Sequence, residues 1–321
     1  MTTTTAAPVA AGPVAPTRTR TARARSRRNL RSALLFLSPW ILGFLVFTLW
    51  PVVYSAYLSL TDYDVINDPR FIGLENYRDM AADPKIALAL TNTVVYTVLA
   101  VPLHVAGALG LALLLERAGR SSGFFRTTFF LPKMTPPVAV GVLVLLLFNG
   151  QNGLVNEALG AVGIQGPYWT TDQMWIKPAL VLMSMWTIGS TVIILLAALR
   201  QVPSELYDAA RVDGAGFWRR TFAVTVPMIS GTLFFVVVVN TIAAFQMFTE
   251  AYTAFFGSGN TTYANEAALF YVIYLFQQGF ENLNMGYASA MAWLLFVIIL
   301  AVTLVQLAVS KRVVYYEGDQ K

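Results

Sequence analysis

Six long apolar stretches constrain the fold of this chain more than any other feature. A bilayer core about 30 Å thick needs roughly 20 apolar residues in each helix that crosses it. The stretches cover residues 33–58, 88–115, 132–148, 175–199, 231–255 and 285–310. Charged residues make up only 12% of the chain, against about 25% in soluble domains. We therefore expect an all-α membrane protein with six transmembrane helices. The 132–148 helix should be the least regular, because Pro132, Pro136 and Pro137 crowd its start.

The positive charges predict how these helices are oriented. Six spans place both termini on one side. If that side is the cytoplasm, it holds all but four of the 22 Lys and Arg residues, the exceptions being Arg70, Arg78, Lys85 and Lys177. Cytoplasmic loops are rich in Lys and Arg, so both termini are expected inside. A cleaved signal peptide fits poorly because the first apolar stretch is too long.

This topology divides the chain into four parts. We expect a disordered basic cytoplasmic tail over 1–32, and a first transmembrane helix with an external loop over 33–87. A transmembrane core follows over 88–310, and a cytoplasmic C-terminal tail over 311–321. The external segments 62–85 and 257–281 are either connecting loops or contacts for an extracytoplasmic partner.

A polar island at 203–227 interrupts the apolar pattern and should face the cytoplasm. Ser204 is expected as the N-cap of a helix through Val212, which breaks at Gly214 before a second helix over 217–225. Its small residues would let a partner surface approach the backbone closely.

The island resembles the EAA loop of binding-protein-dependent ABC importer permeases. The matching residues are Asp208-Ala209-Ala210, Asp213-Gly214-Ala215 and Pro227. The same family is matched by Trp186, Gly189, Leu196-Ala197-Ala198-Leu199, Phe71-Ile72-Gly73-Leu74-Glu75-Asn76-Tyr77, Phe125-Arg126, Phe130-Leu131-Pro132 and Gly286-Tyr287-Ala288-Ser289-Ala290. The combination is similar to the carbohydrate-uptake branch and its maltose-type first permease subunit. The chain departs from the pattern at Asp208 (usually Glu), Thr221 (usually Phe) and 256–260.

The resemblance implies a type I ABC importer transmembrane domain in a bacterial cytoplasmic membrane. Such a chain would form half of a sugar pathway. It would work with a second homologous permease, two ATPase subunits that bind and hydrolyse ATP, and an extracytoplasmic solute-binding protein. Coupling to the ATPase is then assigned to Asp208, Ala209, Ala210, Asp213 and Gly214. The alternative is an amphipathic interfacial helix in which Arg219 and Arg220 reach lipid headgroups around Phe217 and Trp218.

A stripe on the fifth span is the candidate substrate pathway. Asn240, Ala243, Ala244 and Met247 share one helical face. The resemblance adds Thr187 and Ser190 from the fourth span. Polar residues in a span either line a functional cavity or form interhelical hydrogen bonds, and both interpretations remain open. His104 is expected to be a packed, hydrogen-bonded residue rather than a proton relay.

Catalysis and metal binding have little support in the sequence. There is no GxxxxGK[ST] motif, no cysteine and one histidine, so we expect no enzyme activity, no metal site and no cofactor in this chain. The rival to a permease subunit is a self-contained secondary transporter or channel. Its usual signs, ionisable residues in mid-membrane and repeated halves, are not evident.

Overall fold

The structure is a computed structural model that describes residues 33–256 and 265–314. The expected tail 1–32, most of the C-terminal tail and the 257–260 departure lie outside the described residues. The chain divides into two compact units, Met1–Tyr57 and Leu58–Lys321. The expected boundary at 87/88 falls inside a continuous helix, α4 (Pro84–Arg117).

The described part of the first unit belongs to one apolar helical span, Ala33–Leu58. It contains a π-helical turn, η1 (Leu45–Leu49), followed by α2 (Trp50–Leu58). Pro51 lacks an N–H and its ring crowds the carbonyl four residues earlier, and a widened turn relieves that clash. The same arrangement recurs in the second unit, where η5 (Thr221–Thr225) precedes Pro227. These two π turns therefore have a proline as their local cause, whereas a third, η6 (Gln277–Glu281), has none.

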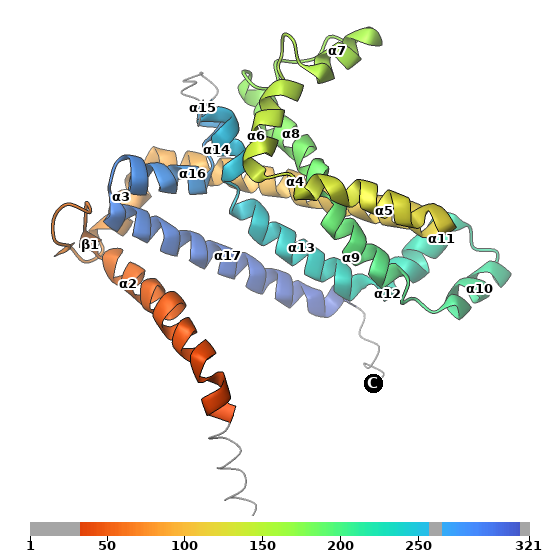
Figure 1. The fold of residues 1–321 in the computed structure, drawn as a ribbon, viewed down its shortest axis with the longest axis horizontal. Coiled ribbons are helices and arrows are strands. Elements are labelled where there is room, and N and C mark those ends of the chain that lie inside the picture. Colours follow the sequence, from red (N-terminus) through yellow and green to blue (C-terminus); the bar gives the residue numbers. More distant parts are fainter. Residues whose placement is uncertain (1–32, 257–264, 315–321) are drawn as a thin grey trace, which may run out of the picture. The chain divides into compact units, whose positions relative to one another are not determined.

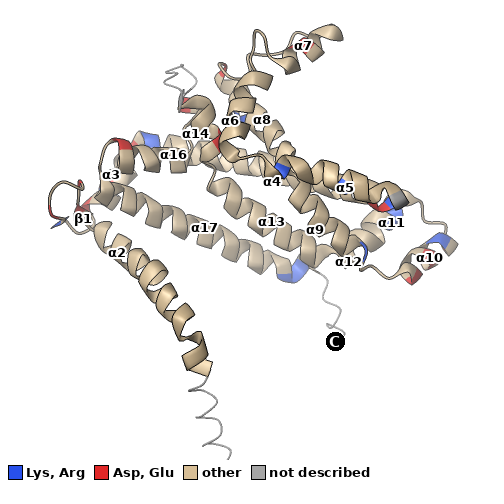
Figure 2. Ribbon diagram, in the orientation of Figure 1, with Lys and Arg blue, Asp and Glu red and all other residues tan. Residues whose placement is uncertain are grey.

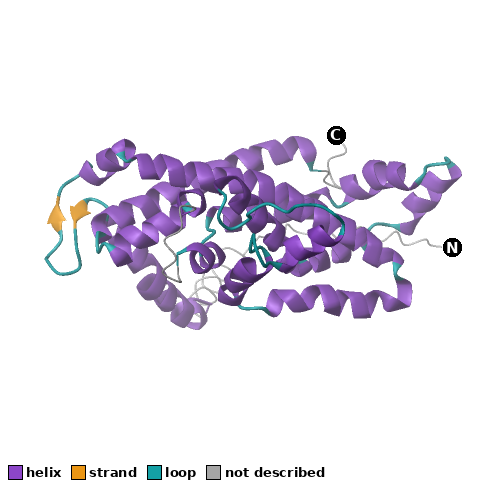
Figure 3. Ribbon diagram, turned by 90° about the horizontal axis from the view of Figure 1, so that it is seen from above, coloured by secondary structure: helices purple, strands orange, loops and turns teal. Residues whose placement is uncertain are grey.

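The second unit is built almost entirely of helices (Figure 1, Figure 3). Its first elements are β1 (Thr61–Asp62), β2 (Arg70–Phe71), α3 (Glu75–Ala82), α4 (Pro84–Arg117), η2 (Gly119–Ser121), α5 (Ser122–Phe130), η3 (Leu131–Met134), α6 (Pro137–Leu147), α7 (Leu154–Ala161), α8 (Gln173–Ser184), η4 (Met185–Thr187) and α9 (Gly189–Leu199). Its last elements are α10 (Ser204–Val212), α11 (Phe217–Arg220), η5 (Thr221–Thr225), α12 (Val226–Met228), α13 (Ser230–Phe245), α14 (Thr249–Phe255), α15 (Asn265–Ala268), α16 (Tyr271–Phe276), η6 (Gln277–Glu281) and α17 (Met285–Val313). The strands pair antiparallel, with Thr61 opposite Phe71.

Two of the expected spans are bent, and one prediction needs correction. Four helices in the described chain are long and apolar enough to cross a membrane, and the number rises to six if each bent helix pair is one span. The predicted third span, 132–148, is not one straight helix. Ser122–Met134 and Pro137–Leu147 meet at 95°, because Pro136 and Pro137 cannot continue the preceding helix. The fourth span bends by 54° between Thr187 and Gly189.

Close backbone packing fixes the second bend. A Cβ on Gly189 would collide with the backbone of Phe129 and Phe130, so α9 lies against the end of α5. The buried core runs from Ile86 and Tyr96 on α4 to Tyr271 and Met291. In Figure 1, α13 and α17 run side by side, joined by a hydrogen bond of 3.0 Å from Gln306 to Thr241.

The fifth span is also interrupted, which the sequence did not predict. Helix α13 ends at Phe245, and Phe248 has φ −142° and ψ −71°, outside the helical region. Helix α14 then begins at Thr249. The break places residues 246–248 in irregular backbone inside an apolar span, where such backbone must line a cavity or be buried in protein.

Candidate functional site

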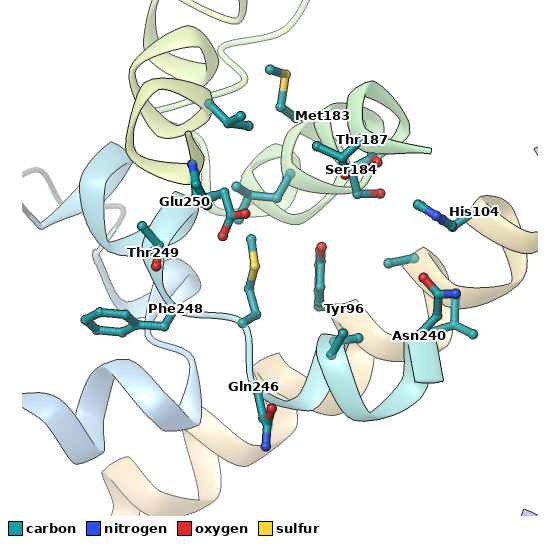
Figure 4. A pocket seen from close by; sticks show the side chains of 18 of the residues that line it. Tyr96, His104, Met183, Ser184, Thr187, Asn240, Gln246, Phe248, Thr249 and Glu250 are labelled. Carbon is teal, nitrogen blue, oxygen red and sulfur yellow. Dashed lines mark hydrogen bonds between the residues drawn. The ribbon is translucent and has the colours of Figure 1, made fainter. Parts of the chain in front are cut away.

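A cavity of about 290 Å³ lies where the bent and broken spans meet (Figure 4). Its wall contains all six predicted pathway residues, Thr187, Ser190, Asn240, Ala243, Ala244 and Met247. Residues 187 and 190 lie on either side of the bend in the fourth span, and 247 lies in the break of the fifth. The structure thus brings Asn240, Ala243 and Ala244 of α13 together with the two residues of the fourth span. Met247 lies beyond the end of α13, so the prediction that it shares their helical face is wrong, although it lines the same cavity.

The polar residues of α13 differ in whether they line the cavity or form a hydrogen bond to another helix. Thr241 forms an interhelical bond with Gln306 and does not line the cavity. The Asn240 amide donates to the Val236 carbonyl of its own helix at 2.8 Å, which leaves its side-chain oxygen as an acceptor. Interhelical bonding therefore accounts for Thr241, whereas Asn240 faces the cavity.

His104 is packed and hydrogen-bonded, as the sequence predicts. Its Nε2 lies 3.2 Å from the Thr191 hydroxyl, and only 9% of the residue is exposed. This bond joins α4 to α9. Its ring also lines the cavity, which was not expected.

Several lining residues were not predicted from the sequence. Helix α4 contributes Tyr96, Ala100 and His104, which follow one another at spacings of four and so share a helical face. That spacing was the available signal. Figure 4 shows the Tyr96 hydroxyl and the Glu250 carboxylate directed into the same space. Glu250 follows the break, and every residue from Gln246 to Glu250 lines the cavity.

Lys133 also lies in the cavity wall. The charge count placed it in a cytoplasmic loop, but it lies in η3 at the 95° bend and lines the cavity. No pattern around the proline-rich bend indicated this. The wall thus carries one cation and one carboxylate, Glu250, and the ion pairs of the described residues do not join them. A solute here would meet both charges among hydroxyl and amide groups.

The tight contact of α6 with α14 holds Glu250 in place. A Cβ on Gly141 would lie 2.7 Å from both the Glu250 carbonyl oxygen and the Thr253 Cβ. Only glycine allows this approach.

The polar island has the predicted helix–break–helix form. Helix α10 is Ser204–Val212, and Gly214 has φ +69°. The Gly214 N–H donates to the Arg211 carbonyl at 3.0 Å and the Ala215 N–H to the Ala210 carbonyl at 2.9 Å. This is a Schellman cap, which needs a left-handed residue. The predicted N-cap is wrong by one residue: Ser204 starts the helix, and Pro203 precedes it without a side-chain cap.

The predicted coupling residues form the open face of this island, hereafter the coupling loop (203–227). Asp208, Ala209, Asp213 and Gly214 are exposed, and Ala210 is half-buried. Asp208 accepts a hydrogen bond from Arg211 at 2.8 Å, with about two-thirds of each side chain exposed. Trp218 and Phe222 stack with 68% and 64% of each residue exposed. Their exposure keeps the interfacial alternative open for the second half of the loop.

Comparisons with known proteins agree with this geometry. The family model for the binding-protein-dependent transport system inner membrane component matches residues 105–315. The chain is 38% identical to the probable ABC transporter permease protein YesP of Bacillus subtilis, over 92% of this chain and 95% of that protein. It is 30% identical to the arabinooligosaccharides transport system permease protein AraP of Halalkalibacterium halodurans, over 89% of each. A chain of a solved bacterial alginate ABC transporter shares the fold, with a TM-score of 0.77 and 22% identity over 92% of this chain and 98% of that one.

This chain belongs to the family of binding-protein-dependent inner membrane transport components. It is a multi-pass membrane protein and a permease subunit of an ABC importer, and its fold is that of ABC importer permeases. The permease therefore has the expected fold class.

A second polar centre lies at the Asp83 end of α4 in the permease. The Asp83 carboxylate accepts hydrogen bonds from the Lys85 N–H at 2.8 Å, the Tyr274 hydroxyl at 2.5 Å and the Tyr287 hydroxyl at 3.0 Å. Partial burial opposes ionisation, but these bonds hold the pKa of Asp83 below its ordinary 3.8. Burial and the neighbouring carboxylate raise the pKa of Tyr274 to about 12.

Proposed function

We propose that this permease forms half of the membrane pathway of an ATP-driven sugar importer, with the cavity as its solute passage. The observation that carries the proposal is the convergence of the six predicted pathway residues on one cavity at a broken span. Transporters often place their substrate sites where helices are discontinuous. Hydroxyl, amide and carboxylate groups beside the Tyr96 and Phe248 rings suit a polyhydroxylated solute. The name of AraP and the alginate complex point to the same class of cargo.

The orientation proposed from the sequence places the coupling loop in the cytoplasm. Helices α10 and α11 and the last turn of α17 carry basic residues, and these elements lie at one end of the second unit (Figure 2). An end rich in Lys and Arg is expected on the cytoplasmic side. Both chain termini would then lie inside a bacterial cytoplasmic membrane.

The proposed partners supply ATP hydrolysis, the other half of the pathway and delivery of the solute. A separate ATPase would bind and hydrolyse ATP and grip the coupling loop. A second homologous permease would complete the pathway, and a solute-binding protein would deliver sugar from outside. The open face around Asp208 and Gly214 supports docking, because exposed small residues permit close approach and a carboxylate offers charge-assisted bonds.

Two matched glycines provide the test. A Cβ meets nothing within 4 Å at either Gly214 or Gly216. Gly214 has φ +69°, whereas Gly216 has φ −68° and ψ 174°, which any residue adopts. A valine at position 214 is therefore strained, and one at 216 is not. We would purify the tagged wild type, Gly214→Val and Gly216→Val from native membranes in mild detergent and identify the copurifying subunits.

We expect an ATPase and a second permease with the wild type and with Gly216→Val. Gly214→Val should keep the permease partner and lose most of the ATPase. Equal ATPase recovery with both variants would contradict the role of the coupling loop. A wild-type chain that purifies alone, folded, and moves solute without ATP would instead support a self-contained transporter.

A further inference from the structure

One long helix connects the coupling loop with the cavity. Helix α4 runs unbroken from Pro84 to Arg117 and accommodates Pro102 in its interior. Its middle supplies Tyr96 and His104 to the cavity wall. Its last residue, Arg117, reaches the coupling loop, with the guanidinium carbon 3.8 Å from the centroid of the Phe217 ring. The cavity and the coupling loop are thus both in direct contact with α4.

The Arg117–Phe217 contact spans a space rather than joining a packed interface. A second cavity, also of about 290 Å³, lies between the end of α4 and the coupling loop. Its wall includes Glu116 and Arg117 from α4, and Tyr207 and Arg220 from the loop. The loop therefore has room to move relative to α4, and the stacked pair bridges that room.

The positive charge of Arg117 can act on the Phe217 ring because it is not engaged in an ion pair within the described part of the chain. Among the described residues, no carboxylate lies within ion-pair distance of it. A guanidinium over an aromatic face is attracted by the ring quadrupole, more strongly when water is partly excluded. A planar guanidinium also stacks in a way that the compact ammonium of lysine does not.

We propose that Arg117 is a positioning residue that transmits movement of the coupling loop to α4. When the ATPase displaces the loop, Phe217 carries Arg117 with it. Because α4 is continuous, the displacement reaches Tyr96 and His104 in the cavity. The bond from His104 to Thr191 passes it on to α9. This inference rests on the proposed coupling to an ATPase, and it adds a non-covalent route beside the covalent links from the loop to α9 and α13.

The absence of cysteine from the chain permits a direct measurement. Leu103→Cys on α4 and Val297→Cys on α17 replace exposed residues and would carry spin labels. The full complex, with cysteines removed from its other subunits, would be measured by electron paramagnetic resonance without nucleotide and after trapping with ATP and vanadate. This readout needs no knowledge of the transported sugar.

The variants are Arg117→Gln, Arg117→Lys, Phe217→Leu and the Arg117→Gln/Phe217→Leu double variant. The controls are Arg312→Gln, an exposed arginine at the end of α17, and Phe124→Leu, a ring that is 73% exposed on α5. Both controls remove the same chemical group from other sites in the second unit.

We expect a nucleotide-dependent distance shift in the wild type and in both controls. Arg117→Gln and Phe217→Leu should each lower the ratio of shifted to unshifted complexes at least threefold, while the ATPase still copurifies. The double variant should be no worse than either single variant, and Arg117→Lys should be intermediate.

A full shift in Arg117→Gln, or no shift in a wild-type complex that retains its ATPase, would overturn the proposal. Loss of the ATPase from the wild type would instead refute the proposed function, so the two failures can be told apart.

Discussion

The two ends of α4 are held in contrasting ways. At Asp83, a carboxylate accepts three hydrogen bonds and ties α4 to α16 and α17. At Arg117, a single stacked contact crosses a cavity to the coupling loop. Within the coupling loop, a hydrogen bond of 3.1 Å between the Tyr207 and Thr225 hydroxyls joins its first and last helical parts.

The difference lies in how each end of α4 is attached to its neighbours. Hydrogen bonds to a charged group are about twice as strong as neutral ones and are directional. The stacked guanidinium is held by attraction to the face of the ring, which is less directional, and the cavity beside it leaves the loop room to move. The stacked contact is therefore the weaker of the two attachments, although Ala108, Ala112 and Leu115 keep the same end of α4 packed against α9 and α13.

The largest effect on stability should come from Asp83→Ala. It removes an ionised acceptor and leaves the Tyr274 and Tyr287 hydroxyls without their partner. We expect a loss of about 3 kcal/mol, seen as a fall of several degrees in the thermal unfolding midpoint of the purified complex. The control is Asp62→Asn, whose pairing with Arg70 is exposed and worth about 1 kcal/mol or less. Equal losses of stability in the two variants would contradict the view that the Asp83 end of α4 is firmly held.

The same end of α4 should show a defined pH window. A carboxyl whose pKa is lowered by folding stabilises the fold above its ordinary value, 3.8 for Asp83, and this contribution is lost as the pH falls through the folded pKa. The difference between wild type and Asp83→Asn should therefore be largest near neutral pH and shrink below about pH 4. A difference independent of pH would show that charge does not matter here.

Tyr274 sets the alkaline limit of that window. Its pKa rises from 10.0 to about 12, so its contribution is complete below pH 10 and disappears as the pH approaches 12. Tyr274→Phe should accordingly differ from wild type at pH 8 and converge with it at the alkaline limit. Unfolding midpoints at several pH values would check this, with Tyr168→Phe, an exposed tyrosine, as the control.

At the Arg117 end, Tyr207→Phe should have a smaller effect. It removes one neutral hydrogen bond to Thr225 and leaves the ring in place. The expected loss is about 1 kcal/mol, with a measurable rise in amide hydrogen exchange over α10. A loss as large as that of Asp83→Ala would contradict the view that the coupling loop is held more weakly than the Asp83 end of α4.

The smallest effect is expected for Arg211→Gln. Its ion pair with Asp208 is exposed and three residues apart on one helix, which is worth about 0.5 kcal/mol or less. Unfolding midpoints should barely change. ATPase copurification that falls despite unchanged stability would identify Arg211 as a docking residue and extend the open face of the coupling loop.

The local chemistry of the chain was enough to predict much of the fold. Apolar length located the spans, and Gly214 located the break of the coupling loop, because a left-handed cap depends on one residue and its immediate neighbours. The face formed by Asn240, Ala243 and Ala244 on α13 was predictable for the same reason, since a helical face follows from spacing alone, whereas Met247 lies beyond the end of that helix.

The remaining features depend on contacts between distant segments. The break at 246–248, the place of Lys133 in the cavity and the stacking of Arg117 on Phe217 have no local signal. Each arises when helices pack: Gly141 admits the backbone of α14, and Gly189 admits that of α5. Spacing in a sequence shows which residues share a face, but which faces meet is settled by the packing of the whole bundle.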